Sequence, residues 1–128
     1  MPARLLAGLL LALAAGAAHA ALKGDPKAGK EIYTRCLACH VLASDSVGPR
    51  YCGLFGRRAG SVKGFEYSDA MKRHKVVWNE KTLDRFLANP MKVVPGTNMT
   101  YAGVPDPKER ADLIAYLKEA TRSGECKK

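Results

Sequence analysis

The chain has 128 residues, a formal net charge of +9 and four cysteines, and 47% of its residues are hydrophobic. This length fits one domain with a core of limited size. The positive charge favours attraction to acidic partners. Nucleic-acid binding is not predicted, because no Lys/Arg cluster alternates with aromatic residues as a base-stacking surface requires.

Residues 1–20 have the composition of a secretory signal peptide. Arg4 supplies a positive charge, residues 5–15 form an apolar run, and Ala18-His19-Ala20 matches the small-x-small cleavage pattern. The apolar run is short for a membrane span, and an uncleaved anchor is the alternative. We therefore expect export to the periplasm or another compartment outside the cytoplasm, with a mature domain over residues 21–128.

The first helix of the mature domain is predicted over residues 26–37. Asp25 is a good N-cap, and Pro26 fits the first helical turn. Gly29 and Tyr33 share one face of this helix. Since Gly29 lowers helix propensity, it predicts a close approach by another element.

The end of this helix carries a Cys-x-x-Cys-His motif, which is typical of c-type haem attachment. Cys36 and Cys39 lie one helical turn apart and can each form a thioether to a haem vinyl group, while His40 can ligate the iron. A tetrahedral zinc site would need a second ligand pair, and Cys52 and Cys126 are single and far apart. A dithiol redox centre expects a βαβ context that the sequence lacks.

The remaining chain predicts loops and short helices without strands. Residues 41–64 are rich in glycine and predict turns. A loop region of this length is unusual in a compact domain unless it wraps a cofactor. Further helices are predicted over residues 68–74, 80–88 and 107–123, with Ser68, Asn79 and Asp106 as N-caps, Asn89-Pro90 ending the second and Gly124 ending the last. The predicted fold class is all-α.

An iron held by one histidine either stays open for chemistry or takes a sixth ligand. Met99 is favoured as that ligand because Pro95-Gly96 and Gly103 bound a loop that can present one side chain inward. A thioether opposite an imidazole raises the reduction potential and occupies the position that O₂ or peroxide needs. The pattern therefore favours an electron carrier. The other candidates for this position are His74, Met71 and Met91.

In these motifs the chain resembles class I cytochrome c, of the mitochondrial and bacterial c₂ kind, over essentially the whole mature domain. The resemblance implies the class I fold, in which the N- and C-terminal helices cross and loops wrap one covalently bound haem c. Its landmarks are Cys36-x-x-Cys39-His40, Gly48-Pro49, Gly53-Leu54-Phe55-Gly56-Arg57, Gly64-Phe65-x-Tyr67, Trp78, Asn89-Pro90, Pro95-Gly96-Thr97-x-Met99, Ala102-Gly103 and Asp112-Leu113-Ile114-Ala115-Tyr116-Leu117.

The resemblance also implies roles for single residues. His40 and Met99 are expected as the axial iron ligands, and the carbonyl of Pro49 is expected to accept a hydrogen bond from the second nitrogen of His40. The residues expected to surround the haem and its propionates are Arg57, Tyr67, Trp78 and Thr97.

The function that the resemblance implies is that of a soluble, monomeric one-electron carrier that cycles haem iron between Fe(II) and Fe(III) and is not an enzyme. Its expected partners are redox complexes, such as a bc₁-type donor and an oxidase, a reaction centre or a dehydrogenase, with only transient contact at a membrane surface. Steering by the haem edge is expected to be weak, because few basic residues remain there. The alternative is a haem protein with a displaceable Met99 that acts in ligand binding or peroxidase chemistry.

Cys52 and Cys126 remain after haem attachment. In an exported chain this pair predicts a disulfide that ties the early loop to the C-terminal tail. Free thiols and an intermolecular bridge are the alternatives.

Overall fold

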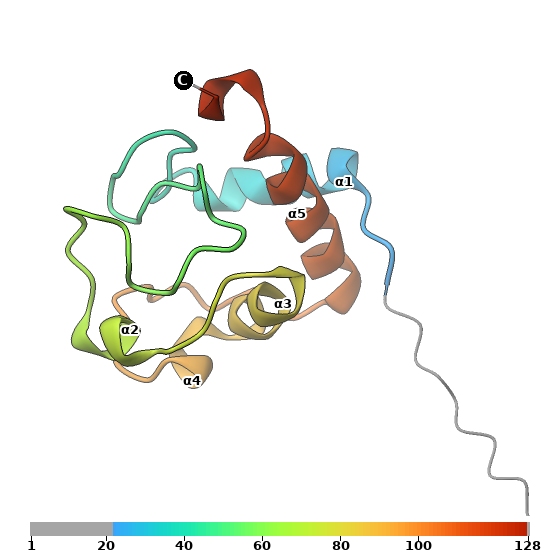
Figure 1. The fold of residues 1–128 in the computed structure, drawn as a ribbon. Helices are drawn as coiled ribbons and strands as arrows, with labels where there is room; N and C mark the ends of the chain where they lie inside the picture. Colours follow the sequence, from blue (N-terminus) through green and yellow to red (C-terminus); the bar gives the residue numbers. More distant parts are fainter. Residues whose placement is uncertain (1–21, 128) are drawn as a thin grey trace, which may run out of the picture.

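The computed structural model describes residues 22–127, so the predicted signal peptide lies outside the described residues. These residues fold into helices joined by long loops (Figure 1). The elements are α1 (Pro26–Tyr33), the 3₁₀ turn η1 (Thr34–Cys36), α2 (Asp69–Arg73), α3 (Glu80–Ala88), α4 (Pro90–Val93), α5 (Pro107–Ala120) and the 3₁₀ turn η2 (Gly124–Cys126). Between residues 22 and 127 the one β-type pairing is an isolated bridge from Arg58 to Val77, which confirms the all-α class.

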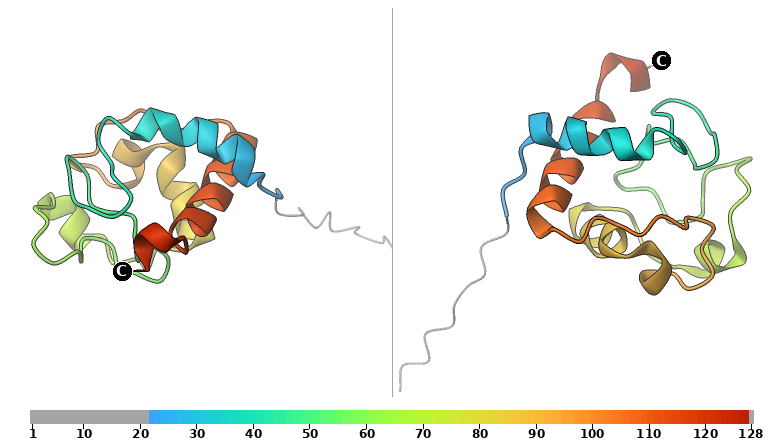
Figure 2. Two further views of the ribbon diagram at one scale, coloured as in Figure 1. Left: turned by 90° about the horizontal axis from the view of Figure 1, so that it is seen from above. Right: turned by 180° about the vertical axis from the view of Figure 1, so that it is seen from behind.

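The two terminal helices α1 and α5 begin alike and cross each other (Figures 1 and 2). Asp25 caps α1 by accepting a hydrogen bond from the backbone N–H of Lys27, and Asp106 caps α5 through Lys108 in the same way. The crossing passes through Gly29, where an added Cβ would lie 1.9 Å from the carbonyl oxygen of Asp112. The predicted close approach at Gly29 is confirmed.

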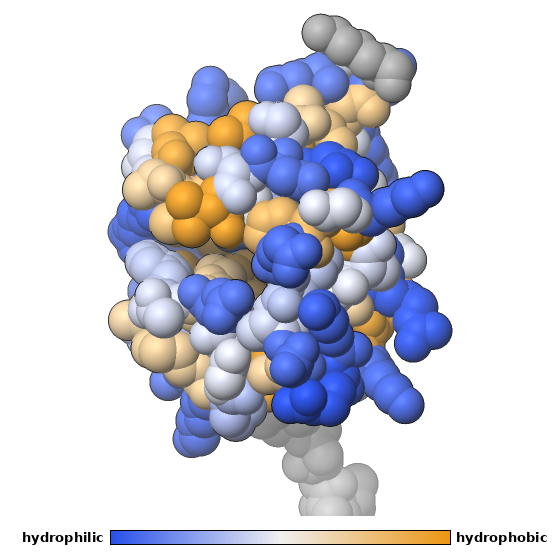
Figure 3. All heavy atoms as spheres, turned by 90° about the vertical axis from the view of Figure 1, so that its left-hand side faces the viewer, coloured by the Kyte–Doolittle hydropathy of each residue, from blue (hydrophilic) through white to orange (hydrophobic). Residues whose placement is uncertain are grey.

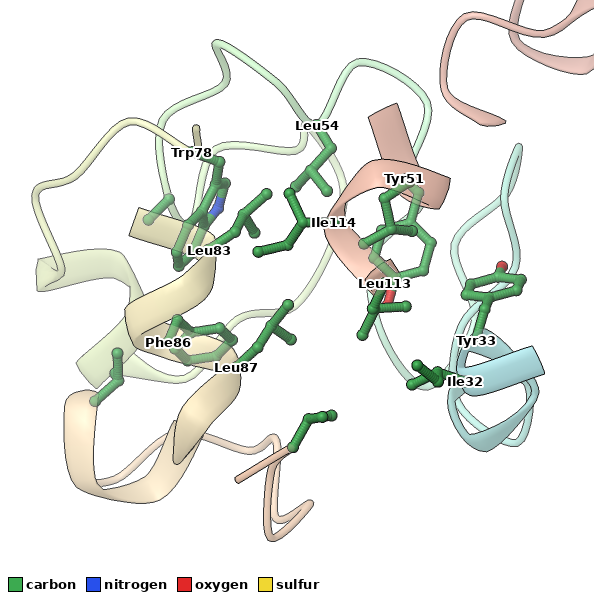
Figure 4. Close-up of a cluster of buried hydrophobic side chains, with 14 of the residues drawn as sticks. Ile32, Tyr33, Tyr51, Leu54, Trp78, Leu83, Phe86, Leu87, Leu113 and Ile114 are labelled. Atoms are coloured by element: carbon green, nitrogen blue, oxygen red, sulfur yellow. The ribbon is translucent and has the colours of Figure 1, made fainter. Parts of the chain in front are cut away.

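The hydrophobic core lies between α3, α5 and the loops that follow η1 (Figure 4). Leu113 of α5 is 1% exposed and forms its centre. From α3, Leu83, Phe86 and Leu87 face the same core, because positions i, i+3 and i+4 share one side of a helix.

Two predicted helix ends were wrong. The α-helix that was expected to reach Leu37 ends at Tyr33 and tightens into η1, where the Thr34 hydroxyl donates a 2.6 Å hydrogen bond to the carbonyl of Glu31. The last helix ends at Ala120 rather than Ser123, and Gly124 opens η2 instead of ending α5. A helix end is set by local hydrogen bonds that sequence patterns locate poorly.

One short helix was missed. The prediction that Asn89-Pro90 ends α3 is confirmed, yet Asn89 also begins a new helix, because its side chain accepts a 3.1 Å hydrogen bond from the backbone N–H of Lys92. The four residues of α4 lead into the loop that carries Met99. Among the described helices, none is long and apolar enough to cross a bilayer.

Candidate cofactor-binding site

A cavity of about 240 Å³ opens between the loops that follow η1 and the loop that follows α4. Figure 3 shows the hollow on this face, with apolar residues gathered above it. Its wall contains, among others, Cys36, Cys39, His40, Pro49, Tyr51, Arg57, Tyr67, Met71, Trp78, Phe86, Thr97, Met99 and Tyr101. Apart from the separate pair Cys52 and Cys126, every residue assigned to the haem site by the family resemblance lines this cavity. Of the other candidates for the sixth ligand, Met71 lines it, and His74 and Met91 do not.

The Cys-x-x-Cys-His motif forms a single turn at one side of the cavity. The carbonyl of Cys36 accepts hydrogen bonds from the backbone N–H groups of Cys39, at 3.1 Å, and His40, at 2.9 Å. Both cysteines carry free thiols, Cys36 half-buried and Cys39 exposed, and burial raises the pKa of the Cys36 thiol. The turn therefore presents two free sulfurs and an imidazole to the cavity.

The ring of His40 is held by its neighbours in the loop that follows. Its Nδ1 lies 3.1 Å from the carbonyl oxygen of Pro49, and a carbonyl only accepts, so Nδ1 carries the proton and Nε2 is left with its lone pair. Burial lowers the pKa of His40, which favours the neutral imidazole. Gly48 packs so closely that an added Cβ would lie 2.2 Å from Cε1 of the ring. A neutral, fixed imidazole with one free nitrogen can serve as a metal ligand.

Met99 also lines the cavity, from the loop after α4. The buried hydroxyl of Thr97 accepts a 3.1 Å hydrogen bond from the backbone N–H of Met99. The N–H of Thr97 in turn donates to the carbonyl of Val94 at 3.0 Å. These bonds fold the loop back, so a thioether and an imidazole enter the cavity from two separate segments.

Arg57 supplies a half-buried cation on the wall. Its Nη2 donates to the carbonyl of Arg50 at 2.9 Å, and Nη1 donates to that of Cys52 at 3.3 Å. Its Nε is buried and is the one side-chain polar atom of that kind without a partner among residues 22–127. Burial lowers the pKa of this guanidinium. A cation whose buried Nε has no hydrogen-bond partner would be stabilised by a bound anion.

Tyr67 and Trp78 complete this side of the cavity. The Tyr67 hydroxyl accepts a 3.1 Å hydrogen bond from the backbone N–H of Val62, which leaves its own proton to donate. Trp78 is buried against Phe86, with ring centroids 5.1 Å apart. Together these residues form an apolar wall that carries a few polar groups.

These residues fit a haem c with its two acid groups. The free thiols match the two vinyl groups, His40 and Met99 match the two axial positions, and the spare donor of Arg57 matches a propionate. Haem is a flat apolar disc with two acid groups at one edge. An apolar cavity with one half-buried cation on its wall is complementary to such a group.

Two contacts at the site were missed by sequence reasoning. The ring of Tyr51 stacks on His40 with centroids 4.6 Å apart and planes 20° apart. At the cavity mouth, both Nη atoms of Arg35 donate to the carboxylate of Glu109, each at 2.9 Å. The sequence hint for this stacking was that Tyr51 lies two residues after Pro49, whose carbonyl was expected to bind His40. The ion pair spans 74 positions and has no signal in a single sequence.

Cys52 and Cys126 lie side by side at the end of the molecule where the C-terminal tail folds back. Their Cα atoms are 5.2 Å apart, a distance that a disulfide can span. The pair lies where the loop that carries Tyr51 meets η2.

The described residues match known proteins along most of their length. The family model for cytochrome c matches residues 26–121. A cytochrome c from Ginkgo biloba is 47% identical over 102 residues, which make up 77% of this chain and 90% of that protein. A cytochrome c2 from Rhodomicrobium vannielii is 45% identical over 111 residues, or 84% of this chain and 87% of that protein. Among solved structures, cytochrome cH from Methylobacterium extorquens superposes with a TM-score of 0.72 at 42% identity, covering 75% of this chain and 99% of that one.

Proposed function

The chain belongs to the cytochrome c family, and from this premise we propose that it shuttles single electrons between larger redox complexes. Members of this family carry covalently bound haem c and act as electron-transfer proteins, not enzymes. The haem supplies an iron that alternates between Fe(II) and Fe(III). The observation that carries the proposal is that His40 and Met99, two side chains able to bind iron, line one cavity from two separate segments of the chain.

Each residue at the site has a role in this proposal. Cys36 and Cys39 anchor the haem through thioethers. His40 binds the iron through Nε2, and the Pro49 carbonyl fixes its ring. Met99 would supply the second iron ligand, which would favour electron transfer over ligand binding. The residues that line the haem and hold its propionates are Arg57, Tyr67, Trp78 and Thr97.

We infer that partners dock at the cavity mouth. Exposed apolar side chains surround the attachment turn and the loop after it, and Val47 is 73% exposed while lining the cavity. The nearby cation of Arg35 is already paired with Glu109. Contact at this face is therefore more apolar than electrostatic, which suits short-lived complexes with a membrane-bound donor and acceptor.

We propose that the protein works outside the cytoplasm after cleavage behind Ala20. The export pattern of residues 1–20 supports this location. The neighbouring positions of Cys52 and Cys126 support a disulfide, which an oxidising compartment maintains.

The test is to produce the full chain in a host that matures c-type cytochromes and to record its absorption spectra. We expect a sharp reduced α-band, haem that stays on the protein in acid–acetone, and in the oxidised form the long-wavelength band of a sulfur–iron bond. Met99→Ala is expected to abolish that last band. Met91→Ala is the matched control, since Met91 is exposed and does not line the cavity.

Three outcomes contradict the proposal. Absence of haem would refute the attachment site. A long-wavelength band that survives in Met99→Ala would refute the sixth ligand. Rapid binding of CO to the ferrous parent protein would favour the displaceable-ligand alternative over electron transfer.

A further inference from the structure

The ring of Tyr51 covers one face of His40, the side chain that would bind the iron. The two ring centroids lie 4.6 Å apart, and the ring planes differ by only 20°, so the rings are stacked. The Pro49 carbonyl contacts the same imidazole at its edge, 3.1 Å from Nδ1. The imidazole is therefore held by one contact in the plane of its ring and by another on a face.

The backbone on both sides of Tyr51 is held by hydrogen bonds. Its N–H donates to the carbonyl of Leu42 at 3.0 Å, and its own carbonyl accepts from the N–H of Leu54 at 2.8 Å. The side chain is 9% exposed and also packs on Tyr33, with ring centroids 5.8 Å apart (Figure 4). A ring that is held in this way can define the orientation of the ring beside it.

The hydrogen bond to Pro49 does not by itself fix the plane of the imidazole. A carbonyl oxygen accepts over a broad range of directions, so the ring could still rotate about the line that joins Nδ1 to that oxygen. The stacked ring of Tyr51 restricts this rotation. The restriction matters for a haem bound in the cavity, because the plane of an axial imidazole decides which iron d orbital it overlaps.

The stack also places the face of a phenol ring against the imidazole. The face is the negative part of an aromatic quadrupole, and it attracts positive charge. An imidazole bound to ferric iron carries more positive charge than one bound to ferrous iron. The phenol face would therefore stabilise the ferric state more than the ferrous state and lower the reduction potential.

We propose that Tyr51 is a positioning residue for His40, whose ring fixes the plane of the imidazole and lowers the reduction potential of the haem. The inference rests on the proposed function, which makes His40 an iron ligand. An aliphatic side chain would fill the same space, but it has neither a flat face to align the imidazole nor a negative quadrupole. Tyr51 thus acts on the iron through the ligand, in addition to its packing in the core.

The experiment compares the haem-loaded full chain with three variants. Tyr51→Phe keeps the ring and removes the hydroxyl, whereas Tyr51→Leu removes the ring. Tyr116→Leu is the matched control, because it makes the same change at a half-exposed tyrosine that packs on Tyr33 and does not line the cavity. Equilibrium redox titration gives the potential. Proton NMR of the ferric protein gives the haem methyl shifts, which report the plane of the imidazole.

Tyr51→Leu is expected to raise the potential, with a change of roughly three- to tenfold in the one-electron equilibrium constant, and to alter the pattern of methyl shifts. Tyr51→Phe and Tyr116→Leu are expected to keep the parent pattern and to stay within about twofold of the parent constant. Parent-like values in Tyr51→Leu overturn the proposal. So does a response of Tyr51→Phe or of Tyr116→Leu equal to that of Tyr51→Leu.

A further substitution covers the case in which Tyr51→Leu does not fold. Replacing Tyr51 with pentafluorophenylalanine keeps a ring of similar shape but reverses the sign of its quadrupole. Relative to Tyr51→Phe, this protein is expected to keep the methyl pattern and to have a higher potential. A potential equal to that of Tyr51→Phe overturns the proposal.

Voltammetry of the same samples separates this proposal from the proposed function. A reversible one-electron wave in the parent, at a potential that Tyr51→Leu shares, refutes the role of Tyr51 alone. Absence of that wave in the parent refutes electron carriage itself.

Discussion

At the crossing of α1 and α5, the backbone of Gly29 packs directly on the carbonyl group of Asp112. An added Cβ would lie 1.9 Å from that oxygen and 2.8 Å from the Cβ of Tyr116. Neither atom can move without shifting α5, because one belongs to the helix backbone and the other is fixed to it. The contact sets the distance between the two terminal helices, and η1 continues directly from the first of them.

Gly29→Ala is therefore expected to lower the free energy of unfolding by roughly 2 kcal/mol, despite the better helix propensity of alanine. Denaturant unfolding of the haem-loaded protein measures it. Gly124→Ala is the matched control, since no atom lies within 4 Å of a Cβ built there, and it should change stability by less than about 0.5 kcal/mol. Equal stability of the two variants would show that α5 can move away at the crossing.

Asp112 makes stability at this crossing depend on pH. Its carboxylate pairs with the ammonium of Lys108 and accepts a 2.6 Å hydrogen bond from the backbone N–H of Asp25, and these partners hold its pKa below the ordinary value. A lowered pKa stabilises the fold above the unfolded-chain value of about 3.9, and the effect disappears as the pH falls through the folded-state pKa. Asp112→Asn is expected to be less stable than the parent at neutral pH.

Unfolding measured at neutral pH and at successively lower pH tests this linkage. The gap between the parent and Asp112→Asn is expected to close below about pH 3.9. Glu119→Gln, an exposed carboxylate on the same helix, is the control and should show a small gap at every pH. A gap for Asp112→Asn that stays constant with pH would mean that packing, not charge, is lost.

Much of this fold is readable in the sequence, for identifiable reasons. The caps at Asp25, Ser68, Asn79 and Asp106 all formed, because each side chain needs only a backbone N–H two or three residues away. The cavity wall was predictable because the attachment motif and the Met99 loop are each short segments in which the functional residues lie close together in the sequence. The family resemblance supplied the roles of Pro49 and Arg57, which no local pattern gives.

What escaped prediction depends on distant contacts or on the last hydrogen bond of a helix. Gly124 resembles a helix stop, yet α5 ends earlier, and the chain after it turns back toward Cys52. The stack of Tyr51 on His40 requires the loop between them to fold first. The pair of Arg35 with Glu109 requires α1 and α5 to cross.

The disulfide that we propose between Cys52 and Cys126 would close a span of 74 residues. A crosslink of that span restricts the unfolded chain and is worth about 2–4 kcal/mol. The double variant Cys52→Ala/Cys126→Ala is expected to lose that amount in denaturant unfolding and to keep its haem. In the native parent a thiol reagent should find no reactive sulfhydryl. Two reactive thiols there would refute the intramolecular bond.

The ion pair at the cavity mouth predicts how electron transfer responds to salt. Glu109 neutralises Arg35, and the pair also holds the pKa of Glu109 below its ordinary value. Glu109→Gln should free the Arg35 cation and speed oxidation by anionic ferricyanide at low ionic strength. At about 1 M salt, where charges are screened beyond roughly 3 Å, the difference should vanish. Glu119→Gln makes the same charge change on α5 away from the cavity wall, and an equal response from it would mean that only net charge matters.

Arg57 is expected to raise the reduction potential of the haem. Its half-buried guanidinium lines the cavity with a spare Nε donor. A fixed cation beside a haem bound there would favour the ferrous state, which carries one positive charge fewer. Arg57→Met is therefore expected to lower the potential by on the order of 60 mV, a tenfold change in the one-electron equilibrium. The variant should also lose stability, because the carbonyls of Arg50 and Cys52 lose their donors.

Two further variants separate charge from packing at this position. Arg57→Lys keeps the charge, but an ammonium cannot donate in all the directions in which the planar guanidinium donates. Its potential should therefore stay nearer the parent while its stability falls. Arg58→Met removes an exposed charge next in the chain, outside the cavity wall, and solvent screening should keep its shift far smaller. Equilibrium redox titration of the haem-loaded proteins measures all three. Equal shifts in Arg57→Met and Arg58→Met would mean that the half-buried guanidinium acts on the iron only through the overall charge of the protein.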